Sequence, residues 1–351
     1  MESIRVNTLR PYDVLIGDGL LSESGARVRA LTKARKVALV SDDRVFPLYG
    51  GKVKASFEEA GFEVSEFVFP HGEASKSFEV YGQLLNFLCA EHLTRTDLIA
   101  ALGGGVTGDL AGFAAATYLR GIDYVQLPTT LLAAVDSSVG GKTAIDLPGG
   151  KNQAGAFLQP LLVLFDPQVL TTLPEEQYRA GSAEVIKYAM IGNAPFFEEL
   201  SATPIRDQAE HVVSVCVSMK RDTVEKDEFD HGERMLLNFG HTFGHAAELA
   251  SDYTLLHGEG VAMGMATITR AAQKRGICVE GTAEKLDALL KQYGLPTEIP
   301  YPDDVIAAGV LSDKKRSGNT VRLVLPEEIG HCVIQSMPGE EIPGWIADGK
   351  E

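Results

Sequence analysis

Three histidines lie within one short stretch of the chain, LNFGHTFGHAAELASDYTLLHGEG, which runs from residue 237 to residue 260. His241 and His245 are four residues apart, so on a helix they lie one turn apart on the same face. His257 follows sixteen residues after the first of them. Because imidazole nitrogens are common ligands of zinc and similar divalent cations, this stretch predicts a metal site.

The spacing of these histidines leaves the ligand set open. His241 and His245 are separated like the two histidines of an HExxH zinc motif, but Thr, Phe and Gly stand between them, so the general-base glutamate is missing. A metal site needs further ligands, and three carboxylates are candidates: Glu184, Glu248 and Glu259. Glu248 and Glu259 could equally be hydrogen-bond partners of a metal ligand or charged residues on a helix surface. Any single histidine could also be an ordinary core or surface residue.

A glycine-rich turn, LGGGVTGDLAGF, follows a strand-like run and opens a helix-like run. Its spacing, Gly103-x-Gly105-x-x-Gly108, lets the backbone approach a pyrophosphate, whose charge the helix N-terminus attracts. The acidic residue that accompanies this motif in dinucleotide-binding units is absent at the usual distance. The turn therefore fits either a bound nucleotide or close packing of a helix on a sheet.

A second loop, residues 128–157, reads PTTLLAAVDSSVGGKTAIDLPGGKNQAGAF. It places Asp136, Lys142, Lys151 and Asn152 among glycines and prolines. Glycines bring backbone N–H groups close to an anion, and lysines supply positive charge. A solvated surface loop is the alternative, but a loop of this length and composition favours a phosphate-bearing ligand.

Strand-like and helix-like runs alternate in the first half of the chain. The strand candidates are residues 36–43, 64–69, 97–105, 124–130 and 161–167, with helix candidates between them. This alternation predicts an α/β fold with a mostly parallel, Rossmann-like sheet. After about Leu173 the pattern is helical as far as a strand candidate at 320–326. We therefore expect an α/β domain over residues 1–174 and a mainly α-helical domain over residues 175–351.

The composition excludes several classes of function. The formal net charge of −16 argues against a general nucleic-acid or anionic-membrane binder, because phosphate groups are held by basic surfaces. The N-terminal residues do not resemble a secretory signal, and no apolar run is long enough to span a membrane. The four cysteines are widely spaced and form no CxxC motif. We expect a soluble, cytoplasmic protein.

Several sequence blocks together resemble the 3-dehydroquinate synthase family of the shikimate pathway. They occur in order between about Pro70 and Pro326, and they read GGGVTGDLAGFAAATYLRG, QLPTTLLAAVDSSVGGKTAIDLPGGKNQAGAF, AEVIKY, ERMLLNFGHTFGHAAE, LHGEGVAMGM and DKKRSG. The resemblance implies a lyase that converts 3-deoxy-D-arabino-heptulosonate 7-phosphate to 3-dehydroquinate and phosphate, on the route to chorismate and the aromatic amino acids. It also implies bound NAD, one divalent cation (zinc or cobalt) and a homodimer.

The resemblance also assigns roles to individual residues. The implied metal ligands are Glu184, His241 and His257, which leaves His245 as a proton-transfer group. The implied catalytic residues are His245, Lys142, Lys187 and Asp136. The implied substrate-binding residues are Arg120, Lys142, Asn152, Lys187, Lys220, Arg234, Asn238, His245 and one or both of Lys314 and Lys315, with Arg120 reaching the neighbouring subunit.

The residues implied for NAD fall in four segments and three single positions. They are Asp42, His71, Gly72, Glu73, Ala74, Ser75, Lys76, Gly104, Gly105, Val106, Thr107, Gly108, Asp109, Thr129, Thr130, Lys142, Lys151, Val169, Leu170, Thr171 and Thr172. The first domain is thus expected to bind NAD, and the second to bind the metal and part of the substrate.

Three other functions fit part of this pattern. A related sugar-phosphate cyclase, which makes an aminodehydroquinate or cyclitol precursor, would share the metal site but differ in its substrate-side residues. A metal-dependent polyol dehydrogenase would use the same two-domain plan but release NADH. A catalytically inactive NAD-binding protein would have no need of the ligands and cations that are present here.

Overall fold

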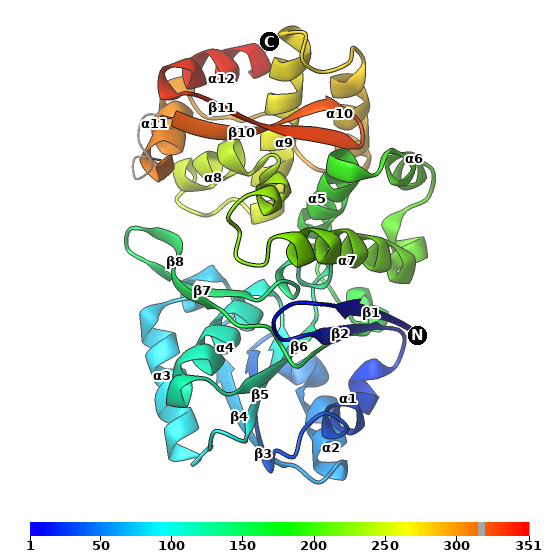
Figure 1. Cartoon of the computed structure of the whole chain (residues 1–351), viewed down its shortest axis with the longest axis vertical. Helices are drawn as coiled ribbons and strands as arrows, with labels where there is room; N and C mark the ends of the chain where they lie inside the picture. Colours follow the sequence, from blue (N-terminus) through cyan, green and yellow to red (C-terminus); the bar gives the residue numbers. More distant parts are fainter. Residues whose placement is uncertain (315–319, 351) are drawn as a thin grey trace. The chain divides into compact units, whose positions relative to one another are not determined.

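The computed structural model describes residues 1–314 and 320–350, with side chains described up to residue 312 and from residue 320 (Figure 1). It divides into two compact units. Unit 1 comprises Met1–Leu173 and Val213–Phe229, and unit 2 comprises Pro174–Val212 and Asp230–Glu351. The division made from the sequence places everything after residue 174 in the second domain, whereas the contacts group Val213–Phe229 with unit 1.

Unit 1 is built on a seven-stranded sheet with the order β1-β2-β9-β6-β5-β3-β4. Every pairing in it is parallel except that of β1 with β2. The strands are β1 Glu2–Val6, β2 Tyr12–Ile16, β3 Lys36–Asp42, β4 Glu63–Phe69, β5 Leu98–Gly103, β6 Asp123–Pro128 and β9 Leu162–Phe165. The central strands β5 and β9 are buried throughout, as expected of parallel strands covered on both faces. The predicted α/β fold with a mostly parallel sheet is confirmed.

Helices cover both faces of this sheet (Figure 1). They are α1 Leu20–Arg29, α2 Gly51–Glu59, α3 Phe78–Ala90 and α4 Gly105–Thr117. Figure 1 shows α1 and α2 on one side of the sheet and α3 and α4 on the other. Side chains of α3 and α4 form one core cluster with β3 and β5, in which Leu84, Leu88 and Leu110 are fully buried. A separate antiparallel hairpin, β7 Lys142–Leu147 with β8 Gly150–Phe157, packs against α4.

Unit 2 is mainly helical, which confirms the helical prediction for the C-terminal half. Its helices are α5 Glu175–Gly192, α6 Ala194–Ala202, α8 His241–Ala250, α9 His257–Lys274, α10 Thr282–Gln292, α11 Asp303–Lys314 and α12 Ile342–Lys350. One antiparallel hairpin, β10 Thr320–Glu328 with β11 His331–Pro338, accompanies them. Helix α7, Ala209–Lys226, begins in unit 2 and continues into unit 1. Among the described residues, no helix is both long and apolar enough to cross a membrane.

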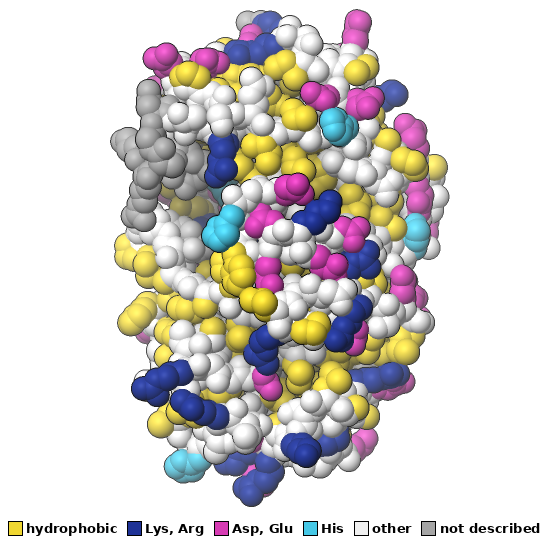
Figure 2. All heavy atoms as spheres, viewed as in Figure 1, with side chains coloured by type: hydrophobic (Ala, Val, Ile, Leu, Met, Phe, Trp, Pro, Cys, Tyr) yellow, Lys and Arg dark blue, Asp and Glu magenta, His cyan; other side chains and the backbone are white. Residues whose placement is uncertain are grey.

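Acidic and basic side chains are interspersed on the face of the molecule shown in Figure 2. This mixture agrees with a sequence in which 48 acidic residues outnumber 32 lysines and arginines. A small anionic ligand therefore has to be held by a local group of cations, because the protein as a whole repels it.

Candidate functional site

Three helices of unit 2 bring Glu184, His241 and His257 together. Glu184 lies in the middle of α5, while His241 and His257 are the first residues of α8 and α9. Their carboxylate oxygens and ring nitrogens lie within 4.8 Å of one another. Glu184 Oε1 is 3.6 Å from His241 Nε2 and 3.4 Å from His257 Nε2. One carboxylate and two imidazoles form the donor set of many zinc sites that keep a position open for substrate.

The third histidine of the cluster, His245, stands beside this group. Its ring centroid is 5.3 Å from that of His241 and 5.8 Å from that of His257, while the other two rings are 5.1 Å apart. Ring distances therefore do not separate the three histidines. Proximity to Glu184 distinguishes them. The group around that carboxylate contains His241 and His257, whereas His245 is grouped with Glu248 and His257.

Hydrogen bonds at the Nδ1 atoms of His241 and His257 leave the Nε2 atoms of both rings facing Glu184. His241 Nδ1 lies 3.1 Å from the backbone carbonyl of Phe239, and His257 Nδ1 lies 2.9 Å from Glu248 Oε1. A carbonyl or carboxylate accepts the Nδ1 proton, which leaves the Nε2 lone pair for a cation. The donor geometry of the described residues thus fits a divalent metal.

The electrostatics of the site fit the same conclusion. Burial lowers the pKa of His241 to about 3, so this ring is neutral at physiological pH. Although burial also lowers the pKa of His257, hydrogen bonds to Glu184 and Glu248 outweigh it and raise this pKa to about 10. Lys187, buried next to Glu184 on α5, forms an ion pair with that carboxylate. The site therefore attracts positive charge, which a proton or a divalent cation can supply.

Glycines allow α8 and α9 to approach closely enough to form this site. A Cβ atom added at Gly264 would lie 1.9 Å from the carbonyl oxygen of Gly240, and one at Gly244 would lie 2.7 Å from the backbone of Gly260. At the start of α9, a Cβ at Gly258 would lie 1.8 Å from the carbonyl oxygen of Ala180 on α5. These contacts leave no room for a side chain, so the glycines fix the distances between the helices that carry Glu184, His241 and His257.

We expect Gly264→Ala to destabilise the protein by about 3 kcal/mol, because its methyl group must push α8 away from α9. The matched control is Gly82→Ala in the interior of α3, where an added Cβ meets nothing within 4 Å. This control should stabilise the protein by ~0.5–1 kcal/mol, since alanine restricts the unfolded chain. Urea unfolding of both variants measures the difference. Equal stability of the two variants would contradict the role given to the helix contact.

In unit 1, the segments expected to contact NAD lie at one edge of the sheet. Parallel strands β3, β4, β5, β6 and β9 end at Asp42, Phe69, Gly103, Pro128 and Phe165. The expected segments begin at or within a few residues of these ends: Asp42, His71–Lys76, Gly104–Asp109, Thr129–Thr130 and Val169–Thr172. Neighbouring parallel strands present their carboxyl ends on one side, which is where open α/β sheets bind nucleotides.

The glycine turn after β5 also has free hydrogen-bonding capacity. Helix α4 begins at Gly105, and Gly104 before it has an extended backbone with no side-chain cap. Among the described residues, Thr107 Oγ1 and Thr129 Oγ1 are buried without a hydrogen-bond partner. Buried hydroxyl groups are normally paired, so these atoms fit the polar groups of a bound cofactor. The reversal of strand order between β3 and β5 marks the same position as a ligand crevice.

A buried ion pair connects this turn to the β7–β8 hairpin. Lys76, which is 5% exposed, donates to Asp109 at 2.5 Å and also to the side-chain oxygen of Asn152. Although burial lowers the pKa of Lys76, the carboxylates of Asp109 and Glu73 outweigh it and raise this pKa. Asn152 has a left-handed backbone with φ of 56°, and its N–H donates to Asp146. The sequence did not identify Asp146, which carries no motif signal of its own.

The remaining predicted site residues are distributed over both units. In unit 1, buried Lys220 on α7 lies 3.0 Å from Asp136 Oδ1, while Lys142 begins β7, and Lys151 lies 3.8 Å from Glu73. In unit 2, Arg234 and Asn238 belong to a short 3₁₀ helix, Glu233–Asn238, that leads into α8. Lys314 ends α11, but its side chain and all of Lys315 lie outside the described residues.

The two other carboxylates have separate positions. Glu248 contacts the side of His257 that faces away from Glu184. Glu259 Oε2 accepts a hydrogen bond of 3.3 Å from the backbone N–H of Leu256, so it caps the start of α9. The sequence left both roles open, and packing of α8 on α9 distinguishes them.

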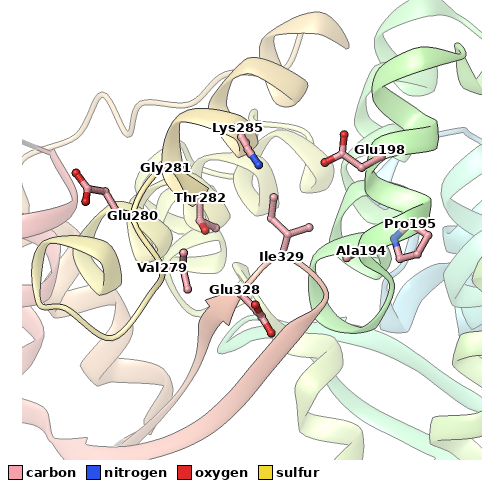
Figure 3. Close-up of a pocket in the computed structure, with 10 residues that line it drawn as sticks. All are labelled: Ala194, Pro195, Glu198, Val279, Glu280, Gly281, Thr282, Lys285, Glu328 and Ile329. Carbon is pink, nitrogen blue, oxygen red and sulfur yellow. The ribbon is translucent and has the colours of Figure 1, made fainter.

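A surface depression of about 420 Å³ lies elsewhere in unit 2. Figure 3 shows it between the start of α6, the start of α10 and the turn between β10 and β11. Lys285 and Glu198 face each other across it, and Ile329 lies between them (Figure 3). None of the predicted site residues lines this depression, so we do not assign the active site to it.

Comparison with known proteins decides the family. Residues 66–180 match the family model described as 3-dehydroquinate synthase N-terminal, and residues 181–316 match the one described as 3-dehydroquinate synthase C-terminal. The 3-dehydroquinate synthase of Streptococcus suis strain 05ZYH33 is 44% identical over 339 residues, which cover 95% of this chain and 96% of that protein. The chain belongs to the 3-dehydroquinate synthase family.

Solved structures of related cyclases share the fold of this 3-dehydroquinate synthase family member. A 2-deoxy-scyllo-inosose synthase, crystallised with carbaglucose-6-phosphate, NAD⁺ and Co²⁺, is 26% identical with a TM-score of 0.89, covering 99% of this chain and 100% of that one. The 2-epi-5-epi-valiolone synthase of Streptomyces hygroscopicus, with NAD⁺ and Zn²⁺ bound, is 28% identical with a TM-score of 0.88, covering 99% and 98%. Both neighbours therefore hold the two groups that the sites described above would accept.

Proposed function

We propose that this chain converts 3-deoxy-D-arabino-heptulosonate 7-phosphate to 3-dehydroquinate and inorganic phosphate. The observation that carries the proposal is the grouping of Glu184, His241 and His257, with His245 beside them, in a member of this family. A related sugar-phosphate cyclase is the second candidate, because the inosose and valiolone synthases share the fold over nearly the whole chain. The 44% identity to a 3-dehydroquinate synthase favours the first.

We assign the two implied groups to different units of the chain. The segments at the carboxyl edge of the sheet in unit 1 would hold NAD, and Glu184, His241 and His257 in unit 2 would hold a zinc or cobalt ion. When bound, these groups supply reversible hydride transfer and polarisation of the substrate hydroxyl that is oxidised. Every other part of the chemistry falls to side chains of the protein and to the substrate itself.

Binding of the substrate requires cations in an acidic protein. The residues proposed to hold the phosphate, carboxylate and hydroxyls of the substrate are Lys142, Asn152, Lys187, Lys220, Arg234, Asn238 and one or both of Lys314 and Lys315. Lys220 and Asp136 act as one unit, because the ammonium group and the carboxylate are 3.0 Å apart. Lys187 is only 1% exposed, so its charge is poorly screened by water and acts strongly on a bound anion.

Proton transfer is assigned to His245. Imidazole exchanges protons near neutral pH, and this ring is outside the group around Glu184 that would hold the metal. Once the substrate carries a ketone, the neighbouring C–H proton becomes more acidic and the departing phosphate can accept it. The later ring opening and intramolecular aldol closure need only modest help from acids and bases. The chain therefore needs few dedicated catalytic groups.

The test supplies heptulosonate phosphate, Co²⁺ and a catalytic amount of NAD. We expect release of one phosphate per substrate consumed and no lasting absorbance of NADH at 340 nm. The product should also be a substrate of a downstream dehydratase. Accumulation of NADH would instead indicate a polyol dehydrogenase. Turnover of a hexose 6-phosphate, but not of the heptulosonate, would indicate the second cyclase candidate.

We further propose that the enzyme is a cytoplasmic homodimer in which Arg120 contacts the substrate phosphate of the neighbouring subunit. Leu119 and Arg120 are consecutive non-glycine residues with positive φ angles of 51° and 69°. Such conformations cost of order 1–3 kcal/mol each and concentrate where function requires them. Arg120 is exposed, and no described residue pairs with its charge.

Mixing two impaired variants, assayed at a substrate concentration well below the raised KM, tests whether Arg120 acts across subunits. Arg120→Ala should raise KM about 10–100-fold, because a charged hydrogen bond to phosphate is lost. If Arg120 acts on the partner's site, then refolding the Arg120→Ala chain together with the His245→Ala chain should restore about a quarter of wild-type activity. Half of the dimers are then hybrids, and each hybrid has one intact site. No recovery in verified hybrid dimers would place Arg120 in its own subunit's site.

A further inference from the structure

Glu248 is a buried carboxylate with no role in the ligand set described above. It lies on α8 and is 1% exposed, and its Oε1 is 2.9 Å from Nδ1 of His257 at the start of α9. A carboxylate can only accept here, so the proton of His257 stays on Nδ1. The other ring nitrogen of His257, Nε2, then faces Glu184 Oε1 at 3.4 Å, where a divalent cation can replace its proton.

The carboxylate of Glu248 also lies near His245, the histidine outside the group around Glu184. Glu248 follows His245 by three residues on α8, and its oxygen lies within 4.8 Å of ring nitrogens of both His245 and His257. With Glu248 bonded to Nδ1 of His257, the other nitrogen of that ring faces Glu184. Glu248 therefore lies where its side chain can separate the roles of the two histidines.

The contact depends on the close approach of α8 and α9. A Cβ atom at Gly260 would lie 3.2 Å from Glu248 Cγ and 3.4 Å from Glu248 Oε1. A side chain at this position would be in tight contact with the side chain of Glu248. Gly260 thus leaves the space in which Glu248 reaches across from one helix to the other.

We propose that Glu248 is a positioning residue that fixes His257 as a ligand of the divalent cation and so leaves His245 free of it. This inference rests on the proposed function only in requiring that the chain binds such a cation. Carboxylates that orient a ligand histidine typically contribute 10–100-fold to metal affinity. Replacing Glu248 should therefore change binding of the metal itself, before any substrate is present.

The test compares three purified variants with the wild-type chain. Glu248→Leu keeps the side-chain volume but removes the acceptor, and Glu248→Gln keeps an acceptor oxygen but removes the charge. Glu259→Gln is the matched control, because this carboxylate caps α9 through the backbone of Leu256 and glutamine can do the same. The Kd for Co²⁺ is measured by competition with a chelator, and the visible absorption of bound Co²⁺ reports its coordination.

We expect the Kd to rise about 10–100-fold in Glu248→Leu, by a smaller factor in Glu248→Gln and less than twofold in Glu259→Gln. The Co²⁺ absorption should also change in Glu248→Leu, because His257 is no longer held in one orientation. A Kd within twofold of wild type in Glu248→Leu, with unchanged absorption, overturns the inference. Wild-type protein that binds no Co²⁺ would instead count against the proposed function. Thermal unfolding without metal identifies any loss caused by misfolding.

Discussion

Replacing His241 with alanine should abolish tight metal binding and lower kcat/KM by about 10³-fold or more, which corresponds to about 4 kcal/mol of transition-state stabilisation. His241 is the first residue of α8, and its Nε2 lies 3.6 Å from Glu184 Oε1. Without it, one carboxylate and one imidazole remain from the group of three. Two ligands are too few for a stable zinc or cobalt site, so the substrate hydroxyl would no longer be polarised.

Metal content by elemental analysis and the phosphate-release assay measure the two effects of His241→Ala together. The fold should survive, because the ring makes one hydrogen bond to the backbone carbonyl of Phe239, and thermal unfolding without metal provides the control. If the variant retained one metal per chain with wild-type affinity, the assignment of His241 as a ligand would be wrong. If it lost the metal but kept its activity, the proposed mechanism would be wrong.

Replacing His245 with alanine should have the opposite combination of effects. We expect metal stoichiometry and affinity close to wild type, but a fall in kcat of about 10²–10⁴-fold, the usual contribution of a group that transfers a proton in the transition state. The reason is the position of His245 beside the proposed ligands, with its ring 5.3 Å from that of His241 and not grouped with Glu184. The fall should appear in kcat more than in KM, since the interaction matters most during reaction.

The comparison of His245→Ala with His241→Ala is informative because the residues are neighbours on one helix face. They differ by one turn of α8, so both variants lose an imidazole from nearly the same place. Loss of the metal from His245→Ala would show that the i and i+4 histidines chelate together, as the spacing by itself suggests. Retention of both metal and full rate would leave His245 without a role in catalysis.

The parallel sheet was predictable because buried parallel strands leave continuous apolar runs in the sequence. The runs at 36–43, 97–105 and 161–167 correspond to β3, β5 and β9. The β1–β2 and β7–β8 hairpins were not predicted, since their strands are short or, like β8, rich in glycine and exposed side chains. Hairpins of this kind have little local signal and depend on packing against the rest of the unit.

Helix α7 shows a second limit of prediction. Its helical pattern is evident, yet the contacts place Val213–Phe229 with unit 1 rather than with the helices around it in the sequence. The reason is long-range bonding, because Lys220 pairs with Asp136 and Glu225 accepts from both the backbone and the side chain of Asn7. Such partners are distant in the chain, so periodicity cannot reveal them.

The α/β and helical halves and the set of histidines and carboxylates that could bind a metal were predictable from local patterns: apolar runs, helical periodicity and motif spacing. The family resemblance implied which of these side chains act together, but spacing along the chain did not. The physical reason that they meet is visible in the packing of the helices. Glycine contacts bring α9 against both α5 and α8, and Glu248 turns His257 toward Glu184. His257 thus joins His241 in the group around Glu184, whereas the histidine only four residues from His241 does not. Close approach of helix backbones depends on packing between segments far apart in the chain, which spacing along one helix does not encode.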